Sequence, residues 1–408
     1  MKKLLLPLLL IGAARADFAL KDGDTLAFLG DSITAARGYP KVVEHYTLMR
    51  YPERKVRFIN AGVGGDTATR CLARLESDVF AKGATVVTVA VGINDIGWGT
   101  KADDEHKQLY LDGIRTIIER CREKKVRPII CSPAITAEAP DTAEKGYLQT
   151  MADEGLALAK SMGVETIDLQ RGMREVQRRV LEHNADAKAD DQARLHVKDG
   201  IHLDDLGQMA MGYAMLKGLG APEDVSSACI DFKTSQADTV NCEISGVKTS
   251  EREIHFTRID GGLPLNFGPF TLLQYRWIPL TDGLNRYMLS VKNLPEGEYE
   301  IRANDRSLGK ASAEALAKGL NIASMTGNGW EPGGPWDVQS CVVKEFVDAR
   351  DKLMEGRRLH TMFRPKDLKI DPLWLRMNGQ ENTLIDLQRN AAKPVPYLFS
   401  ITPAAAAE

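Results

Sequence analysis

Three residues of the chain have the types that together perform nucleophilic catalysis. A serine hydroxyl attacks a carbonyl carbon only when a neighbouring base takes its proton, and histidine suits that task near neutral pH. Among the seven histidines, only His202 has a carboxylate, Asp199, three residues earlier in a glycine-containing turn. Asp199 can accept a hydrogen bond from Nδ1–H of His202, which leaves Nε2 to face a serine. Ser32, in the segment Gly-Asp-Ser-Ile, is the candidate nucleophile.

The elements that must position these residues form an alternating pattern between residue 24 and about residue 220. Short apolar runs alternate with amphipathic stretches, which indicates β-α repeats, a mostly parallel sheet and a three-layer α/β/α fold. The run 84–91 is β-branched and apolar at nearly every position, as expected of a strand that is buried on both faces. We predict strands at 25–29, 56–59, 84–91, 127–131 and 165–168, and helices at 109–124, 138–162 and 172–184.

Four segments with functional side chains lie where such a sheet would bring them together. Residues 30–32, 60–67 and 92–95 each follow a predicted strand, and residues 199–202 precede the last helix of this region. The carboxyl ends of strands in open α/β sheets carry the ligand crevice. In order and spacing, the four segments resemble the conserved blocks of the SGNH, or GDSL, hydrolase superfamily. The resemblance covers about residues 24–220.

The resemblance implies a serine esterase with a flavodoxin-like fold and the same catalytic triad: Ser32 as nucleophile, His202 as base and then acid, and Asp199 as the orienting carboxylate. It also places the family's oxyanion-hole glycine on Gly65 and its asparagine on Asn94, beside the N–H of Ser32. Gly65 permits close backbone approach, and Asn94 offers a side-chain amide. Gly62 or Gly64 is the donor if the loop is shifted.

Motifs of other enzyme classes are absent from the sequence. Residues 30–34 do not form the G-x-S-x-G elbow of α/β-hydrolases, and there is no H-E-x-x-H, P-loop or complete dinucleotide fingerprint. We therefore expect neither a cofactor nor a metal. Asp22, Asp24 and Asp31 are interpreted as turn and cap residues, and Asp95 as part of the hydrogen-bond network around Asn94.

The chain length and net charge indicate the number of domains and exclude one class of partner. A chain of 408 residues exceeds one typical hydrophobic core, so we predict a hydrolase domain at 17–220 and a smaller β-rich domain at 221–408. In the second domain, strands are expected at 229–232, 241–245, 253–258, 287–291, 299–303 and 383–387, with a helical insertion at 336–359. The net charge of −3 gives no electrostatic drive towards nucleic acid.

The N-terminus has the pattern of an export signal. Two lysines precede an apolar run too short to span a membrane, and Ala-Arg-Ala at 14–16 has the A-x-A form of a cleavage site. We expect residues 1–16 to be removed from a secreted or periplasmic protein without a membrane span. Export permits disulfides. Of the six cysteines, Cys229 and Cys242 are the favoured pair, and buried free thiols are the alternative for the others.

The expected substrate is an O-acyl, above all O-acetyl, ester on extracellular carbohydrate such as sialic acid, pectin or xylan. Trp98 is the favoured substrate contact because it closely follows Asn94. Arg37 is a weaker candidate for contact with an acidic sugar, with a structural role preferred. Trp330 and Trp336 are interpreted as core residues before sugar-binding ones. A lipase or thioesterase, and a carbohydrate-binding module with a vestigial site, are the alternatives.

Overall fold

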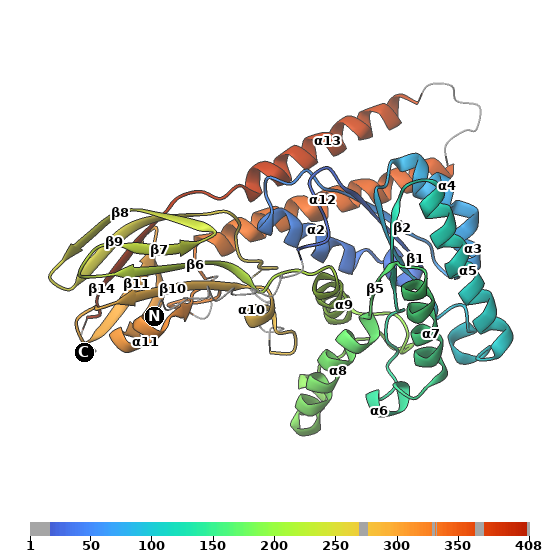
Figure 1. The fold of residues 1–408 in the computed structure, drawn as a ribbon, viewed down its shortest axis with the longest axis horizontal. Coiled ribbons are helices and arrows are strands. Elements are labelled where there is room, and N and C mark those ends of the chain that lie inside the picture. The colour runs from blue at the N-terminus through green and yellow to red at the C-terminus, as the bar shows by residue number, and fades with distance from the viewer. Residues whose placement is uncertain (1–16, 269–275, 329–330, 332, 364–370, 406–408) are drawn as a thin grey trace, which may run out of the picture.

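The computed structural model describes residues 17–268, 276–328, 331, 333–363 and 371–405. The predicted export signal and Trp330 lie outside these residues. An α/β unit and a β-rich unit lie at opposite ends of the molecule, and two long helices run from the β-rich end alongside the α/β unit (Figure 1). Within the described residues, no helix is both long and apolar enough to cross a membrane.

The α/β unit contains one parallel sheet of five strands in the order β2-β1-β3-β4-β5. The strands are β1 (Thr25–Gly30), β2 (Arg57–Gly62), β3 (Val86–Ala90), β4 (Arg127–Cys131) and β5 (Glu165–Ile167). All five predicted strands are confirmed.

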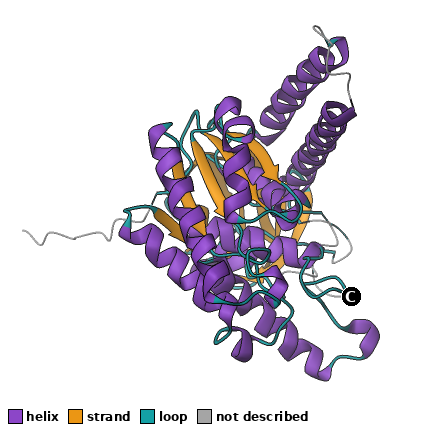
Figure 2. Ribbon diagram, turned by 90° about the vertical axis from the view of Figure 1, so that its right-hand side faces the viewer, coloured by secondary structure: helices purple, strands orange, loops and turns teal. Residues whose placement is uncertain are grey.

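Helices cover both faces of this sheet, which makes the predicted three layers (Figure 2). Alternate residues of β1 enter two separate hydrophobic clusters: Leu26 and Phe28 join one, and Ala27 and Leu29 join the other. The first cluster also includes residues of α2 (Gly38–Arg50), α8 (Leu169–Asp186) and α9 (Asp205–Gly218), and the second includes residues of α3 (Ala68–Cys71), α5 (Asp104–Glu123) and α7 (Tyr147–Ser161). This double burial explains why the strands are apolar at nearly every position.

The predicted helices at 109–124 and 172–184 correspond to α5 and α8. The helix predicted at 138–162 is two helices, α6 (Pro140–Ala143) and α7, because Gly146 has extended backbone angles and caps the start of α7. The remaining short helices of the α/β unit are α1 (Ser32–Ala35) and α4 (Leu75–Asp78), with 3-10 turns at Leu72–Arg74, Phe80–Lys82, Gly97–Gly99 and Ala189–Asp191.

The β-rich unit contains two sheets, in the orders β13-β10-β6-β7 and β12-β11-β14-β9-β8. The strands are β6 (Asp224–Asp231), β7 (Ala237–Val240), β8 (Cys242–Ser250), β9 (Glu253–Asp260), β10 (Arg286–Lys292), β11 (Glu298–Ala303), β12 (Arg306–Ser312), β13 (Leu320–Asn321) and β14 (Tyr397–Pro403), with short helices α10 (Leu280–Gly283) and α11 (Ala313–Lys318). The first five strands predicted here correspond to β6, β8, β9, β10 and β11.

The two long helices are α12 (Pro335–Phe363) and α13 (Pro372–Ala392), and they pack against each other. The helical insertion predicted at 336–359 is confirmed. The strand predicted at 383–387 is wrong, because this segment lies inside α13. Asp371 caps that helix by accepting from Trp374 N–H, and Ile385 and Gln388 are buried one helical turn apart.

The predicted disulfide between Cys229 and Cys242 is also wrong, since all six cysteines are free thiols. Cys229 on β6 pairs in register with Asp238 of β7, whereas Cys242 begins β8 in the other sheet. The Cys242 thiol instead donates to the carbonyl of Ser227.

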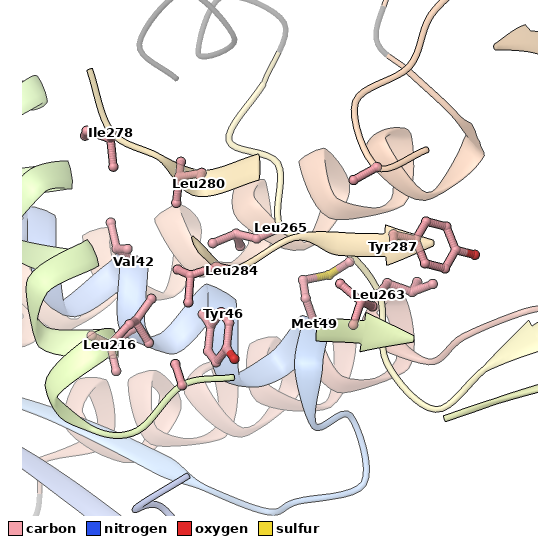
Figure 3. Close-up of a cluster of buried hydrophobic side chains, with 14 of the residues drawn as sticks. Val42, Tyr46, Met49, Leu216, Leu263, Leu265, Ile278, Leu280, Leu284 and Tyr287 are labelled. Atoms are coloured by element: carbon pink, nitrogen blue, oxygen red, sulfur yellow. The ribbon is translucent and has the colours of Figure 1, made fainter. Parts of the chain in front are cut away.

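A continuous hydrophobic core joins the α/β unit to the β-rich unit. Val42, Tyr46 and Met49 on α2 contact a layer of side chains from residues 263–265 and 278–287 (Figure 3). The same cluster continues through Tyr287 to Trp336, which is fully buried and whose indole N–H donates to the carbonyl of Ala323. Trp336 is therefore a core residue, in agreement with the interpretation from the sequence.

Candidate active site

The ends of three neighbouring strands bring three of the four sequence blocks to one edge of the sheet. Gly30, the last residue of β1, lies in register with Gly62 on β2 and with Ala90 on β3. The segments that follow these strands carry Ser32, Gly65 and Asn94. Parallel pairing thus places the candidate nucleophile and the candidate oxyanion donors in adjacent loops.

Two of these strand-end residues must be glycine because α1 packs directly on them. A Cβ on Gly30 would lie 2.0 Å from Oγ1 of Thr34, and a Cβ on Gly62 would lie 2.3 Å from the backbone nitrogen of Ala35. Both distances are far below van der Waals contact. The missing side chains let the helix that begins with Ser32 lie against the end of the sheet.

The local sequence also sets the start of that helix. Asp31 is the N-cap residue, and its Oδ1 accepts from the N–H of Ile33 at 2.9 Å. Ser32 therefore occupies the first helical position, where a backbone N–H has no partner within the helix. This N–H is available to a developing oxyanion.

Ser32, His202 and Asp199 lie in hydrogen-bonding sequence. His202 Nε2 lies 2.9 Å from Ser32 Oγ, and His202 Nδ1 lies 2.6 Å from Asp199 Oδ2. With Nδ1–H donating to the carboxylate, Nε2 is free to accept the serine proton. The structure thus brings together three residues that span 170 positions of the chain.

A tight turn before α9 holds the histidine and its carboxylate. Oδ1 of Asp199 accepts from the N–H groups of Ile201 at 2.8 Å and His202 at 2.9 Å, and Gly200 between them has a φ of +70°. The hydrogen bond from His202, followed by these backbone donors, lowers the pKa of Asp199 to about 2. The carboxylate stays ionised wherever His202 is the working base.

The side-chain amide of Asn94 has three hydrogen-bond partners, one of which is Asp31 Oδ2, 3.5 Å from Asn94 Nδ2 and next to Ser32 in the chain. Its Nδ2 donates to the carbonyl of Asp66 at 3.0 Å, and its Oδ1 accepts from Trp98 Nε1–H at 2.9 Å. An indole N–H can only donate, so it fixes Oδ1 on the Trp98 side and the NH₂ group on the other. Trp98 also packs edge-on against His202, with ring centroids 5.7 Å apart.

Trp98 occupies an unusual backbone position. Its φ is +57°, between Gly97 at +50° and Gly99 at +94°, and 51% of its surface is exposed. A left-handed conformation costs a bulky residue about 1–2 kcal/mol. An exposed tryptophan held in this way beside Asn94 and His202 fits the predicted substrate contact, which stays a prediction.

The glycine-rich loop narrows the choice of oxyanion donor. Gly62 lies within β2 and its N–H already donates to Oδ1 of Asn60 at 3.0 Å, so it does not suit the role. Gly65 has a φ of +73° and a carbonyl that accepts from Arg70, while a Cβ on Gly64 would meet nothing within 4 Å. Gly65 stays the predicted donor, with Gly64 as its alternative.

The loops that carry Ser32, Gly65 and Asn94 also contain three buried carboxylates, Asp31, Asp66 and Asp95. Burial raises the pKa of Asp31 to about 6 and that of Asp95 to about 7. Asp95 accepts from Ala68 N–H at 2.9 Å, while its Oδ2 has no hydrogen-bond partner. Asp66 is paired with Arg74, whose Nε lies 2.6 Å from Oδ2. Among the described residues, no cluster of three or more His, Cys, Asp or Glu side chains could hold a metal ion.

Arg74 is a positioning residue that the sequence did not reveal. Besides Asp66, its guanidinium donates to the carbonyl of Ala61 at 2.5 Å and to that of Gly30 at 3.0 Å. It therefore ties the ends of β1 and β2 to the loop that carries Gly65. Arg74 follows Asp66 by eight residues, and oppositely charged residues at such a spacing are common on surface helices. No sequence signal therefore indicated a role for Arg74.

Gln208 makes a second connection that the sequence did not indicate. Its Nε2 donates to the carbonyl of Ile33 and its Oε1 accepts from Tyr39 N–H. This side chain links α9, which follows His202, to the short helix that begins with Ser32.

The Arg37 side chain is engaged by one of the two long helices. Its Nε pairs with Asp351 of α12 at 2.5 Å, and its side chain is largely buried. This ion pair fits the structural role that the sequence favours for Arg37. The sequence predicts an exposed side chain, whereas this side chain is largely buried.

Comparison with known proteins finds a family whose profile matches part of the chain. The profile of the GDSL-like Lipase/Acylhydrolase family matches residues 28–210, a little under half of the chain. The match contains Ser32, Gly65, Asn94, Asp199 and His202.

Two curated proteins are similar to parts of the chain. An acetylxylan esterase of Geobacillus stearothermophilus is 34% identical over 89 residues, which is 18% of this chain and 41% of the relative. An uncharacterized lipoprotein, YqeF, of Bacillus subtilis is 30% identical over 121 residues, which is 28% of this chain and 49% of the relative. The chain thus matches less than half the length of either protein.

The complete architecture has a solved counterpart. The structure of BT4096, a gut microbial diltiazem-metabolizing enzyme, superposes with a TM-score of 0.78 at 22% identity, covering 94% of this chain and 98% of that one. The combination of an α/β unit, β-rich unit and helical pair is therefore an established fold.

Proposed function

We propose that the protein is a serine esterase that removes acyl groups, above all acetyl groups, from carbohydrate. The observation that carries the proposal is the pair of hydrogen bonds from Ser32 Oγ to His202 Nε2 and from His202 Nδ1 to Asp199 Oδ2. The similarity of residues 28–210 to this acylhydrolase family supports ester chemistry. The partial similarity to an acetylxylan esterase supports acetylated glycan as the substrate class.

The first half of the reaction acylates the enzyme. Ser32 Oγ attacks the ester carbonyl carbon while its proton passes to His202 Nε2. The carbonyl oxygen becomes an oxyanion and accepts hydrogen bonds from Ser32 N–H, the glycine loop and the Asn94 amide. When the intermediate collapses, the bond to the sugar oxygen breaks, and that oxygen leaves with the proton from His202.

The second half regenerates the serine. His202 takes a proton from water, and the resulting hydroxide adds to the acyl carbon to form a second oxyanion. Collapse breaks the bond to Ser32 Oγ, which recovers the proton from His202, and acetic acid leaves and gives its own proton to solvent. Asp199 remains ionised throughout and stabilises the imidazolium formed in each half.

The test of ester chemistry is release of p-nitrophenol from p-nitrophenyl acetate. We expect Ser32→Ala to lower kcat by about 10⁴-fold or more. Ser77→Ala, which removes an exposed serine outside the family blocks, is the matched control and should retain full activity. Equal rates for Ser32→Ala and the unchanged protein would refute the assignment of Ser32 as the nucleophile.

The test of substrate class compares acetate release from acetylated xylan, pectin and O-acetylated sialic acid with hydrolysis of p-nitrophenyl palmitate. Faster turnover of the long-chain ester than of every glycan would favour the lipase alternative. The proposal includes export, which rests on the basic and apolar pattern of residues 1–16. It is checked by N-terminal sequencing of protein recovered outside the cytoplasm.

A further inference from the structure

A second cavity, of about 630 Å³, lies between the edge strand of the parallel sheet and the two long helices. Residues 57–63 of β2 and its flank form one wall, and α12 and α13 form the opposite wall. Neither Ser32, Asp199 nor His202 lines it. Its volume lies within the range of about 300–1,000 Å³ that is typical of small-molecule sites.

The walls of this cavity are fixed by a set of ion pairs between α2 and α12. Arg350 of α12 is almost fully buried, donates to both oxygens of Glu44, and reaches the carbonyl of Phe58 on β2 at 2.8 Å. Lys41 and Arg37 pair with Asp348 and Asp351 at 2.7 and 2.5 Å. These contacts hold the helices against the sheet edge, so the cavity is present before any ligand arrives.

The cavity carries excess positive charge on a chain whose net charge is negative. Seven basic and four acidic side chains line it. Each acidic group already has a basic partner: Glu44 with Arg350, Glu381 with Arg350 and Arg357, Asp351 with Arg37, and Asp78 with Arg74. By contrast, three exposed cations, Arg57, Lys82 and Arg358, form no side-chain hydrogen bond or ion pair with any described residue. They are free to bind an anion.

The rest of the lining is largely apolar. Phe58, Met354 and Ile385 contribute to it, together with Trp374, over whose ring the Arg357 guanidinium lies at 4.5 Å. Aromatic and methionine side chains accommodate flat apolar groups, and methionine adapts to their shape. A neutral sugar would not use the unpaired cations, and an inorganic ion would not use the apolar wall.

We propose that this cavity is a second binding site, separate from the esterase centre, for a small organic anion with an apolar body, of the aromatic carboxylate class. The apolar wall takes the ring, and the unpaired cations bind the carboxylate. This inference goes beyond the proposed function, because binding here requires no turnover at Ser32.

The test is calorimetric titration of the whole protein with 2-naphthoate and with its neutral analogue 2-naphthalenemethanol. We expect the acid to bind more tightly than the alcohol. In Lys82→Gln/Arg358→Gln, loss of charge-assisted hydrogen bonds should weaken naphthoate binding by about tenfold or more and leave the alcohol unchanged. Ile385→Trp, which fills the cavity, should weaken both.

The matched control is Lys145→Gln/Lys352→Gln, which removes the same charge from exposed positions outside the lining and should bind as the unchanged protein does. Hydrolysis of p-nitrophenyl acetate should be equal in all these variants and in the unchanged protein, and absence of hydrolysis by the unchanged protein itself would count against the proposed function alone. Equal affinity for acid and alcohol, or no naphthoate binding, overturns the proposal. So does naphthoate binding that competes with p-nitrophenyl acetate and is unchanged by Ile385→Trp.

Discussion

Replacement of Trp98 by phenylalanine isolates one hydrogen bond of the candidate oxyanion hole. The change keeps an aromatic ring beside His202, makes it smaller, and removes the indole N–H that holds Oδ1 of Asn94. Without that donor, Asn94 Oδ1 loses its partner and the amide is held only through Nδ2, which weakens its alignment towards an oxyanion. We therefore expect kcat to fall while KM changes little.

The size of the effect follows from the bond that is lost. A neutral hydrogen bond contributes about 0.5–1.5 kcal/mol, and each 1.36 kcal/mol is tenfold in rate, which gives a fall in kcat of about 2- to 12-fold. The ceiling is the loss of the Asn94 donor itself, about 10²–10³-fold. Because Trp98 is half exposed, the melting temperature should stay close to that of the unchanged protein.

The assay is a double-mutant cycle with p-nitrophenyl acetate. Trp98→Phe, Asn94→Ala and the double variant are compared with the unchanged protein. If the indole acts through Asn94, Trp98→Phe should have no further effect on kcat once Asn94 is alanine. Fully additive effects, or an unchanged kcat in Trp98→Phe, would refute the reasoning.

Three further predictions concern stability. Asp95→Asn should raise the melting temperature at pH 8 but not at pH 4. Burial raises the pKa of the Asp95 carboxyl from about 4 to about 7. The unchanged protein therefore loses up to a few kcal/mol of stability as the pH rises between these two values, and the variant does not. Thermal melts at both pH values check the sign, and a gain confined to pH 4 would contradict it. Arg74→Gln should lower the free energy of unfolding by about 3 kcal/mol in urea titration, because it leaves buried Asp66 with only the longer, 3.7 Å ion pair to exposed Arg70. A loss below about 0.5 kcal/mol, the range of ordinary surface changes, would show that the pair with Arg74 is not needed. Gly30→Ala should destabilise the protein by about 1–3 kcal/mol or more, since the added Cβ meets Thr34, whereas Gly356→Ala, in open space on α12, should stabilise it by about 1 kcal/mol; the same urea titration decides, and equal effects would be inconsistent with the packing of α1.

The strand pattern and the motif residues were predictable because both depend on local sequence. Five apolar runs locate the parallel sheet, and the short blocks after them place Ser32 and Asn94 at its edge. His202 and Asp199 were predictable because one turn contains both. Arg74 and Gln208 were not, since the contacts that tie them to the site are to backbone carbonyl and amide groups, which no residue pattern encodes.

The helical pair explains the main errors in the C-terminal half. Thr383 and Ile385 have β-branched side chains that favour a strand locally, yet Asp371 caps a helix and α12 supplies a surface for its buried face. The wrong cysteine pairing arose similarly. Sequence separation suggested one hairpin, but the chain changes sheets between Cys229 and Cys242.

The core that α2 shares with residues 263–265 and 278–287 has a consequence for how the two halves can vary. Met49 and Tyr46 lie against side chains such as Leu263 and Leu284, more than 200 positions away. A substitution on one side changes the space available to the other. The halves are therefore expected to be inherited together, and a chimera that joins the first half to a β-rich unit from a distant relative should be rescued only by substitutions made on both sides of this contact.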